Sequence, residues 1–146
     1  MTATIATSTR PPLTTATLDL LDRAYAALAE ATCAGTTADR YVAAHLSGLR
    51  AGAALLATRG PVSGRGRPRS VWELLPAAAP ELGEWAAFYA ASATRRSVAE
   101  RGGPVSAREA DDLVRASETF LALVESALGA PPHAPLPSLQ VATGGR

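Results

Sequence analysis

The segment RYVAAH, residues 40–45, places an arginine and a histidine five positions apart. An imidazole near its ordinary pKa can take a proton from a 2′-hydroxyl group or return one to a leaving oxygen. A guanidinium can bind a phosphate through two parallel hydrogen bonds. Arg40 and His45 are therefore candidate catalytic residues for acid–base chemistry on a bound phosphate ester. The alternative is structural: Arg40 is solvated or pairs with Asp39, and His45 is a hydrogen-bonded residue near the core edge.

A second candidate is the basic loop SGRGRPR, residues 63–69. Residues 59–69 hold four arginines and no acid, although the whole chain carries a formal net charge of only +1. The order Arg-Gly-Arg-Pro resembles the centre of an AT-hook, whose arginines lie along a narrow A·T minor groove. The same loop could hold RNA phosphates without sequence preference. Arg65, Arg67 and Arg69 are thus candidate nucleic-acid-binding residues, and the alternative is a loop whose arginines only maintain solubility.

Other chemically capable residues give no metal or cofactor prediction. The single cysteine, Cys33, excludes an internal disulfide and a cysteine-based zinc site. Asp111 and Asp112 are adjacent on a predicted helix, where their side chains point about 100° apart, and no third ligand lies near them. We expect no metal and no cofactor.

The elements that carry these residues are predicted to be helices, because apolar residues recur at helical spacing between capping and breaking residues. Thr17, Thr37, Ser70 and Ser106 are the expected N-caps, and the last two open capping boxes. The expected helices cover residues 18–33, 38–59, 71–75, 80–101 and 107–128.

The composition favours an all-α bundle of four to five helices. Alanine supplies 33 of the 146 residues, and β-branched aliphatic residues are scarce. We expect a disordered arm at 1–16, a helical domain at 17–128 and a disordered Pro/Gly-rich tail at 129–146. Trp85 and Phe88 are expected in the core, and Gly48 with Gly52 could form a close-contact surface. The chain offers no membrane span, and the cytoplasm is the simplest compartment.

Three blocks of the sequence resemble the small actinobacterial group of HEPN-domain proteins: residues 44–60 (AHLSGLRAGAALLATRG), 69–96 (RSVWELLPAAAPELGEWAAFYAASATRR) and 105–125 (VSAREADDLVRASETFLALVE). The resemblance implies a helical bundle that dimerises. Many HEPN domains bind RNA or nucleotides, and some pair with a minimal nucleotidyltransferase. Others are metal-independent endoribonucleases of toxin or defence systems, in which an Arg-x4–6-His motif lies at the dimer interface. Arg40 and His45 match that spacing.

Three functional hypotheses follow. The first is a non-catalytic HEPN-like module, a homodimer that contacts RNA, a nucleotide or a partner protein such as a nucleotidyltransferase or an antitoxin. The second is a metal-independent endoribonuclease that uses Arg40 and His45. The third is a DNA-associated accessory protein that contacts duplex through the basic loop at 64–69. A partner module predicts a sizeable exposed apolar patch.

Overall fold

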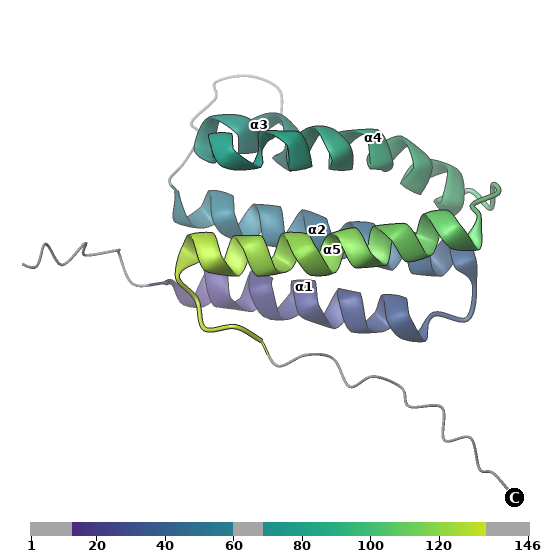
Figure 1. The fold of residues 1–146 in the computed structure, drawn as a ribbon, viewed down its shortest axis with the longest axis horizontal. Coiled ribbons are helices and arrows are strands. Elements are labelled where there is room, and N and C mark those ends of the chain that lie inside the picture. The colour runs from purple at the N-terminus through teal and green to yellow at the C-terminus, as the bar shows by residue number, and fades with distance from the viewer. Residues whose placement is uncertain (1–12, 60–68, 134–146) are drawn as a thin grey trace, which may run out of the picture.

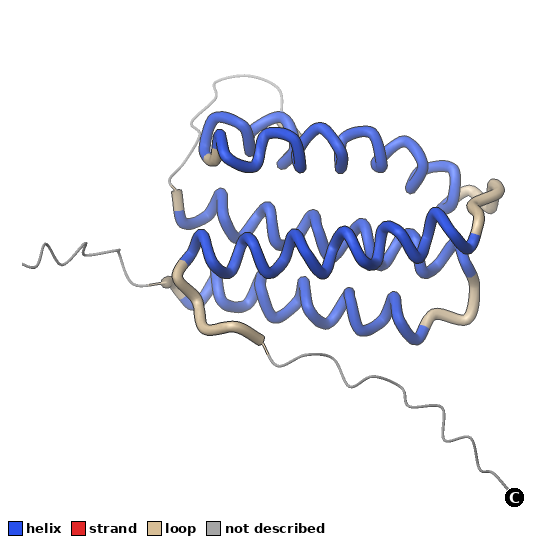
Figure 2. The backbone as a smooth tube through the Cα atoms, viewed as in Figure 1, coloured by secondary structure: helices blue, strands red, loops and turns tan. Residues whose placement is uncertain are grey.

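The structure is a computed structural model that describes residues 13–59 and 69–133 (Figure 1). Figure 2 shows only helices and loops in this part of the chain, which confirms the predicted all-α bundle. The elements are α1 (Thr15–Cys33), α2 (Thr37–Thr58), α3 (Val71–Ala78), a 3-10 turn η1 (Pro80–Leu82), α4 (Gly83–Glu100) and α5 (Ala107–Leu128). None of the described helices is both long enough and apolar enough to cross a membrane.

Helix α2 is the centre of the bundle, because it packs against α1, α3, α4 and α5. In Figure 1, α3 and α4 form one layer, α2 and α5 lie in the middle, and α1 lies on the opposite side. Alanines allow α1 and α2 to approach closely: Ala24, Ala27 and Ala31 of α1, and Ala44, Ala51 and Ala54 of α2, are almost fully buried. Larger buried side chains fill the remaining core: Leu21, Leu28, Leu55, Trp72, Leu75, Tyr89, Leu113, Phe120 and Leu121.

Local capping interactions fix where α5 begins and ends. The Ser106 hydroxyl accepts the N–H of Glu109 at 3.1 Å, and the Glu109 carboxylate accepts the N–H of Ser106 at 2.9 Å. This reciprocal pair is the capping box that the sequence predicts. Gly129 ends the helix in the left-handed conformation, at φ 67°, where a side chain would be strained.

The first two helices begin earlier than predicted. Thr14 caps α1 by accepting the N–H of Thr17 at 3.2 Å, so residues 15 and 16 belong to the helix and not to an N-terminal arm. Thr17 is buried instead, and its hydroxyl is 3.1 Å from the hydroxyl of Thr58. Thr36, and not Thr37, caps α2 by accepting the N–H of Asp39. Threonines in series make the capping residue ambiguous until tertiary contacts select one.

The segment between α2 and α4 also differs from the prediction. Ser70 caps α3 as expected by accepting the N–H of Glu73, but α3 continues through Pro76 to Ala78. The N–H of Ala79 then donates to the carbonyl oxygen of Leu75 at 2.8 Å and closes the helix. The predicted helix at 80–101 starts as the 3-10 turn η1, and its α-helical part begins at Gly83.

The two glycines of α2 make their close contacts within the chain. A Cβ atom at Gly48 would collide with the ring of Tyr89, and one at Gly52 would lie 2.8 Å from Cγ1 of Val71. Both positions are buried. The close approach that these two glycines allow therefore joins α2 to α3 and α4 within one chain.

The end of the described chain is attached to the bundle. Residues 129–133 were expected to belong to a disordered tail, yet the N–H of His133 donates to Glu125 at 2.9 Å. The ring of His133 also stacks on Tyr25 of α1, with centroids 3.8 Å apart. The folded unit therefore extends at least to His133, because a buried carboxylate on α5 and an aromatic ring on α1 both hold it.

Candidate functional site

His45, the predicted catalytic histidine, lies inside the bundle and is only 1% exposed. Its Nε2 is 3.2 Å from the carbonyl oxygen of Tyr89, and its Nδ1 is 3.3 Å from Nη1 of Arg96. Because Arg96 can only donate, the imidazole must accept at Nδ1 and donate from Nε2 to Tyr89. Burial lowers the pKa of His45, and the Arg96 charge acts in the same direction. The arrangement therefore holds a neutral imidazole.

Arg40, its predicted partner, makes a separate contact. Nη1 of Arg40 donates to Oδ1 of Asp111 at 2.6 Å, which links the first turn of α2 to α5. The side chain is 29% exposed, whereas His45 is covered. Within the described chain, the two residues do not share an accessible surface. Their joint action on a phosphate stays a prediction that requires His45 to become uncovered.

Arg96 is the His45 neighbour that the sequence did not single out. It reaches His45 from α4 and also lies 3.6 Å from the carboxylate of Glu100. The next residue back, Arg95, pairs with Glu109 at 3.0 Å and donates to the carbonyl oxygen of Pro104. No sequence signal identifies Arg96, because its contact depends on how α4 crosses α2.

A hydrogen-bonded line of side chains runs through the core beside His45. The hydroxyl of Ser117 donates to the carbonyl oxygen of Ala44 at 2.9 Å, so Tyr89 donates its own hydroxyl to Ser117 at 2.8 Å. Burial raises the pKa of Tyr89 well above its usual range. Tyr89 also stacks on Trp72 at 4.5 Å with nearly parallel rings. This cluster is buried and presents no chemical group to solvent.

Of the predicted basic loop, only Arg69 belongs to the described residues, and it is exposed just before α3. Arg65 and Arg67 lie outside the described residues. Nucleic-acid binding by these three arginines therefore stays a prediction.

The described residues contain no cluster of three His, Cys, Asp or Glu side chains that could hold a metal ion. Cys33 is exposed at the end of α1 and is a free thiol. Asp112 pairs with Arg115 at 2.6 Å rather than acting with Asp111. Within residues 13–59 and 69–133, no ligand set is present on which a metal function could be built.

The prediction that Phe88 is a core residue was wrong, because Phe88 lies on the surface of α4. Phe88 is 43% exposed, and Trp85 is only partly buried. Together with Glu84 of α4 and Ala116 of α5, these two aromatic side chains line a hollow of about 350 Å³. Trp85 also lines a second hollow of about 420 Å³ that reaches Leu123, which is 40% exposed. A depression that is mostly apolar, but is also lined by Glu84, Glu81 and Arg59, therefore runs between α4 and α5.

The outward side of α4 has a regular pattern, which we call the α4 face and define as Glu84, Ala87, Phe88, Ala91 and Arg95. Glu84, Phe88, Ala91 and Arg95 follow at i, i+4, i+7 and i+11, so they form one stripe along the helix. The two alanines are exposed. A single aromatic ring is thus flanked by small residues, with an acid at one end and a base at the other. This geometry suits close packing against another helix.

The chain is similar to a known protein family. The model described as SAV_6107-like HEPN matches residues 31–125, which is about two thirds of the chain. The curated proteins and the solved structures gave no match. The matched range runs from the last turn of α1 into the last turn of α5, and it includes Arg40, His45 and the whole α4 face.

Proposed function

The chain belongs to the SAV_6107-like HEPN family, and we propose that it is a non-catalytic HEPN-like module that binds protein through the α4 face. One observation carries this proposal. Phe88 is exposed at the centre of an alanine-rich stripe and beside an apolar depression, although the chain contains only two phenylalanines. A large apolar side chain in such surroundings is typical of a protein interface.

The charges around the depression favour protein over RNA. Glu84 lines the first hollow, and Glu81 lines the second, where it pairs with Arg59 at 2.8 Å. Carboxylates at these positions would repel a phosphate backbone. Unpaired bases could stack on Phe88, but stacking proteins combine such rings with a basic groove. The described part of α4 and α5 lacks that groove along this surface.

A second copy of this chain is the partner that the α4 face fits best. If two α4 helices meet antiparallel, Phe88 of each copy packs on Ala91 of the other. The same register places Glu84 of each copy opposite Arg95 of the other, so both ends of the contact join opposite charges. Arg95 is 41% exposed despite its own pair with Glu109, and can reach a second carboxylate. Self-complementarity of this kind is what a two-fold interface requires.

A protein other than a second copy is the alternative occupant of the α4 face. The family resemblance suggests a nucleotidyltransferase or an antitoxin, and such a protein would compete for the same face.

The endoribonuclease alternative rests on the spacing of Arg40 and His45. The coverage of His45 and its lowered pKa favour the non-catalytic function, because a general acid at neutral pH needs an accessible, titrating imidazole.

Sedimentation equilibrium of the full chain tests the proposal. A small interface predicts a dimer that dissociates in about the micromolar range. Phe88→Asp should leave a monomer with unchanged helical content. Leu18→Asp is the matched control, because Leu18 on α1 is 40% exposed but lies away from α4. A wild-type chain that stays monomeric at about 100 μM, or a Phe88→Asp chain that still dimerises, would contradict self-association.

A further inference from the structure

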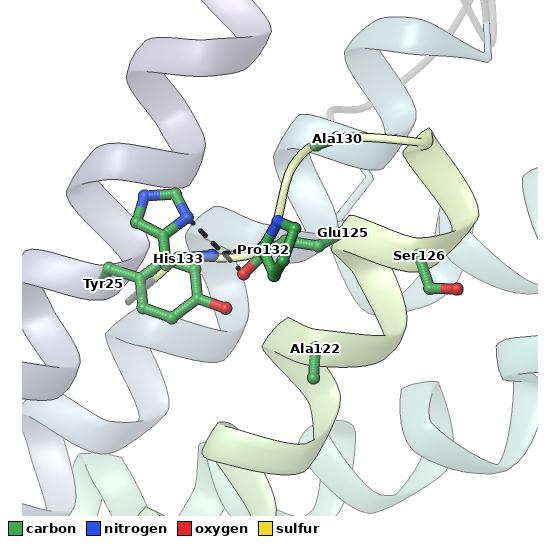
Figure 3. Close-up of a pocket in the computed structure, with 7 residues that line it drawn as sticks. All are labelled: Tyr25, Ala122, Glu125, Ser126, Ala130, Pro132 and His133. Carbon is green, nitrogen blue, oxygen red and sulfur yellow. Dashed lines mark hydrogen bonds and ion pairs between the residues drawn. The ribbon is translucent and has the colours of Figure 1, made fainter. Parts of the chain in front are cut away.

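A second surface lies on the other side of the bundle, where the chain leaves α5. Residues 130–133 run across the groove between α1 and α5 and cover a pocket of about 370 Å³ (Figure 3). Tyr25 of α1, Glu125 of α5 and His133 are among the residues that line it. The pocket is separate from the α4 face, and nothing in the proposed function uses it.

His133 occupies this groove in the way that a bound ligand would. Its ring lies flat on Tyr25, with centroids 3.8 Å apart and an interplanar angle of 13°. Nε2 is 3.2 Å from Oδ1 of Asp22, and Nδ1 is 3.5 Å from Oε1 of Glu125. Figure 3 shows the two rings next to each other, with Glu125 directed toward His133. A flat, nitrogen-containing ring is thus stacked on one face and faces a carboxylate at each edge.

The fit of the imidazole is incomplete. Glu125 is 3% exposed, and among the described residues neither its Oε1 nor Nδ1 of His133 has a hydrogen-bond partner. The groove presents carboxylate oxygens from both α1 and α5, and the ring of His133 comes no closer than 3.5 Å to the one from Glu125. A buried carboxylate oxygen without a donor costs free energy. The groove therefore has acceptor capacity that His133 leaves unused.

A guanidinium group would fit both the aromatic face and the carboxylates of this groove. It is planar, so it can stack on Tyr25 as the imidazole does, and it stays charged at every accessible pH. Its five N–H donors can engage both oxygens of Glu125 and still reach Asp22. A primary ammonium has donors but no flat face, so it would forgo the Tyr25 contact.

We infer that the α1–α5 groove is a binding site for a guanidinium group, and that His133 occupies it as an internal stand-in. Binding displaces His133 and releases residues 130–133 from α1. The source of the guanidinium is either a small molecule or an arginine of a peptide, since both present the same group.

Titration of the full chain with agmatine, followed by amide NMR, tests the site. Agmatine should shift the resonances of Tyr25 and Glu125 and free the N–H of His133. His133→Ala should bind agmatine about tenfold more tightly, the gain expected if His133 fills the site about nine-tenths of the time. Glu125→Gln should weaken binding about thirtyfold or more in the same background, because a buried partner charge is lost. A short peptide with one central arginine separates the two sources by its affinity relative to agmatine.

Glu118→Gln is the matched control, because Glu118 lies exposed on α5 and outside this pocket. Circular dichroism and the thermal midpoint establish that each variant is folded. The site would be overturned if a folded Glu125→Gln chain bound agmatine with unchanged affinity. It would also be overturned if His133→Ala bound agmatine no more tightly than the wild type. If Glu125→Gln does not fold, wild-type spectra decide alone: agmatine must perturb Tyr25 and His133 and not the α4 face.

Discussion

His45 donates from Nε2 to the carbonyl oxygen of Tyr89, 3.2 Å away on α4. The two rings also meet edge to face at 5.7 Å. A polar side chain at the centre of α2 is thereby joined to the helix that carries the exposed face. Because this contact joins α2 to α4, the stability of the fold should depend on the charge of His45.

The first prediction concerns pH. Burial lowers the pKa of His45 from 6.5, so below about pH 6.5 the unfolded chain binds a proton that the folded chain does not. The free energy of unfolding should therefore fall as the pH decreases from about 7.5 to about 5.5, and His45→Gln should lose about 1 kcal/mol of that dependence. Urea unfolding of both proteins at the two pH values measures it. If the free energy of unfolding changed equally with pH in the wild type and in His45→Gln, then His45 would not titrate as inferred.

The second prediction concerns the contact between α2 and α4. Gly48→Ala places a Cβ against the Tyr89 ring and should destabilise the fold by about 1–3 kcal/mol. Gly83→Ala is the control, since Gly83 is also helical and has no atoms within 4 Å of an added Cβ. It should be neutral or stabilise by up to about 1 kcal/mol. Equal thermal midpoints for the two variants would contradict the close packing.

The third prediction concerns the buried hydroxyl pair. Ser117→Ala leaves the Tyr89 hydroxyl and the carbonyl oxygen of Ala44 without this partner, which should cost about 1–3 kcal/mol. Tyr89→Phe removes the other hydroxyl. A double-mutant cycle on the free energy of unfolding should give a coupling of about 1 kcal/mol between them. Strict additivity would mean that the hydrogen bond contributes no stability.

The fourth prediction tests the antiparallel register of the α4 face. Glu84→Arg alone and Arg95→Glu alone should each weaken the dimer, because like charges then meet at both ends of the contact. An equimolar mixture of the two variants should recover it, since the mixed dimer pairs the two introduced charges at one end and the two native charges at the other. Sedimentation of each variant and of the mixture measures this, with thermal midpoints to control for loss of the Arg95–Glu109 pair. A mixture no tighter than its components would reject the register.

The fifth prediction addresses catalysis. The purified chain in excess EDTA should leave a single-stranded RNA intact, because the neutral imidazole of His45 is covered. Arg40→Ala and His45→Gln should then behave as the wild type does. Cleavage by the wild type that is lost in both variants would instead support the endoribonuclease alternative.

Much of the architecture follows from local chemistry that the sequence states directly. Ser106 with Glu109 begins α5, Gly129 ends it, and Ser70 begins α3, because each interaction joins residues that are close along the chain. The buried stripe of α5 has an equally local origin, because a 3.6-residue apolar period identifies a stripe without reference to its neighbours. These signals determined an all-α bundle.

Tertiary structure decided which stripe is covered and which polar group is buried. On α4, the apolar period includes both Phe88 and Tyr89, but α2 covers Tyr89 and leaves Phe88 exposed. His45 is buried where Arg96 and Tyr89 of α4 contact its ring. Glu125 is buried where its carboxylate accepts the N–H of residue 133. The hydrophobic period of a sequence identifies the apolar side of one helix and says nothing of the helices that pack on it. The burial of a side chain depends on how several helices cross, and that crossing is set by the packing of the whole core.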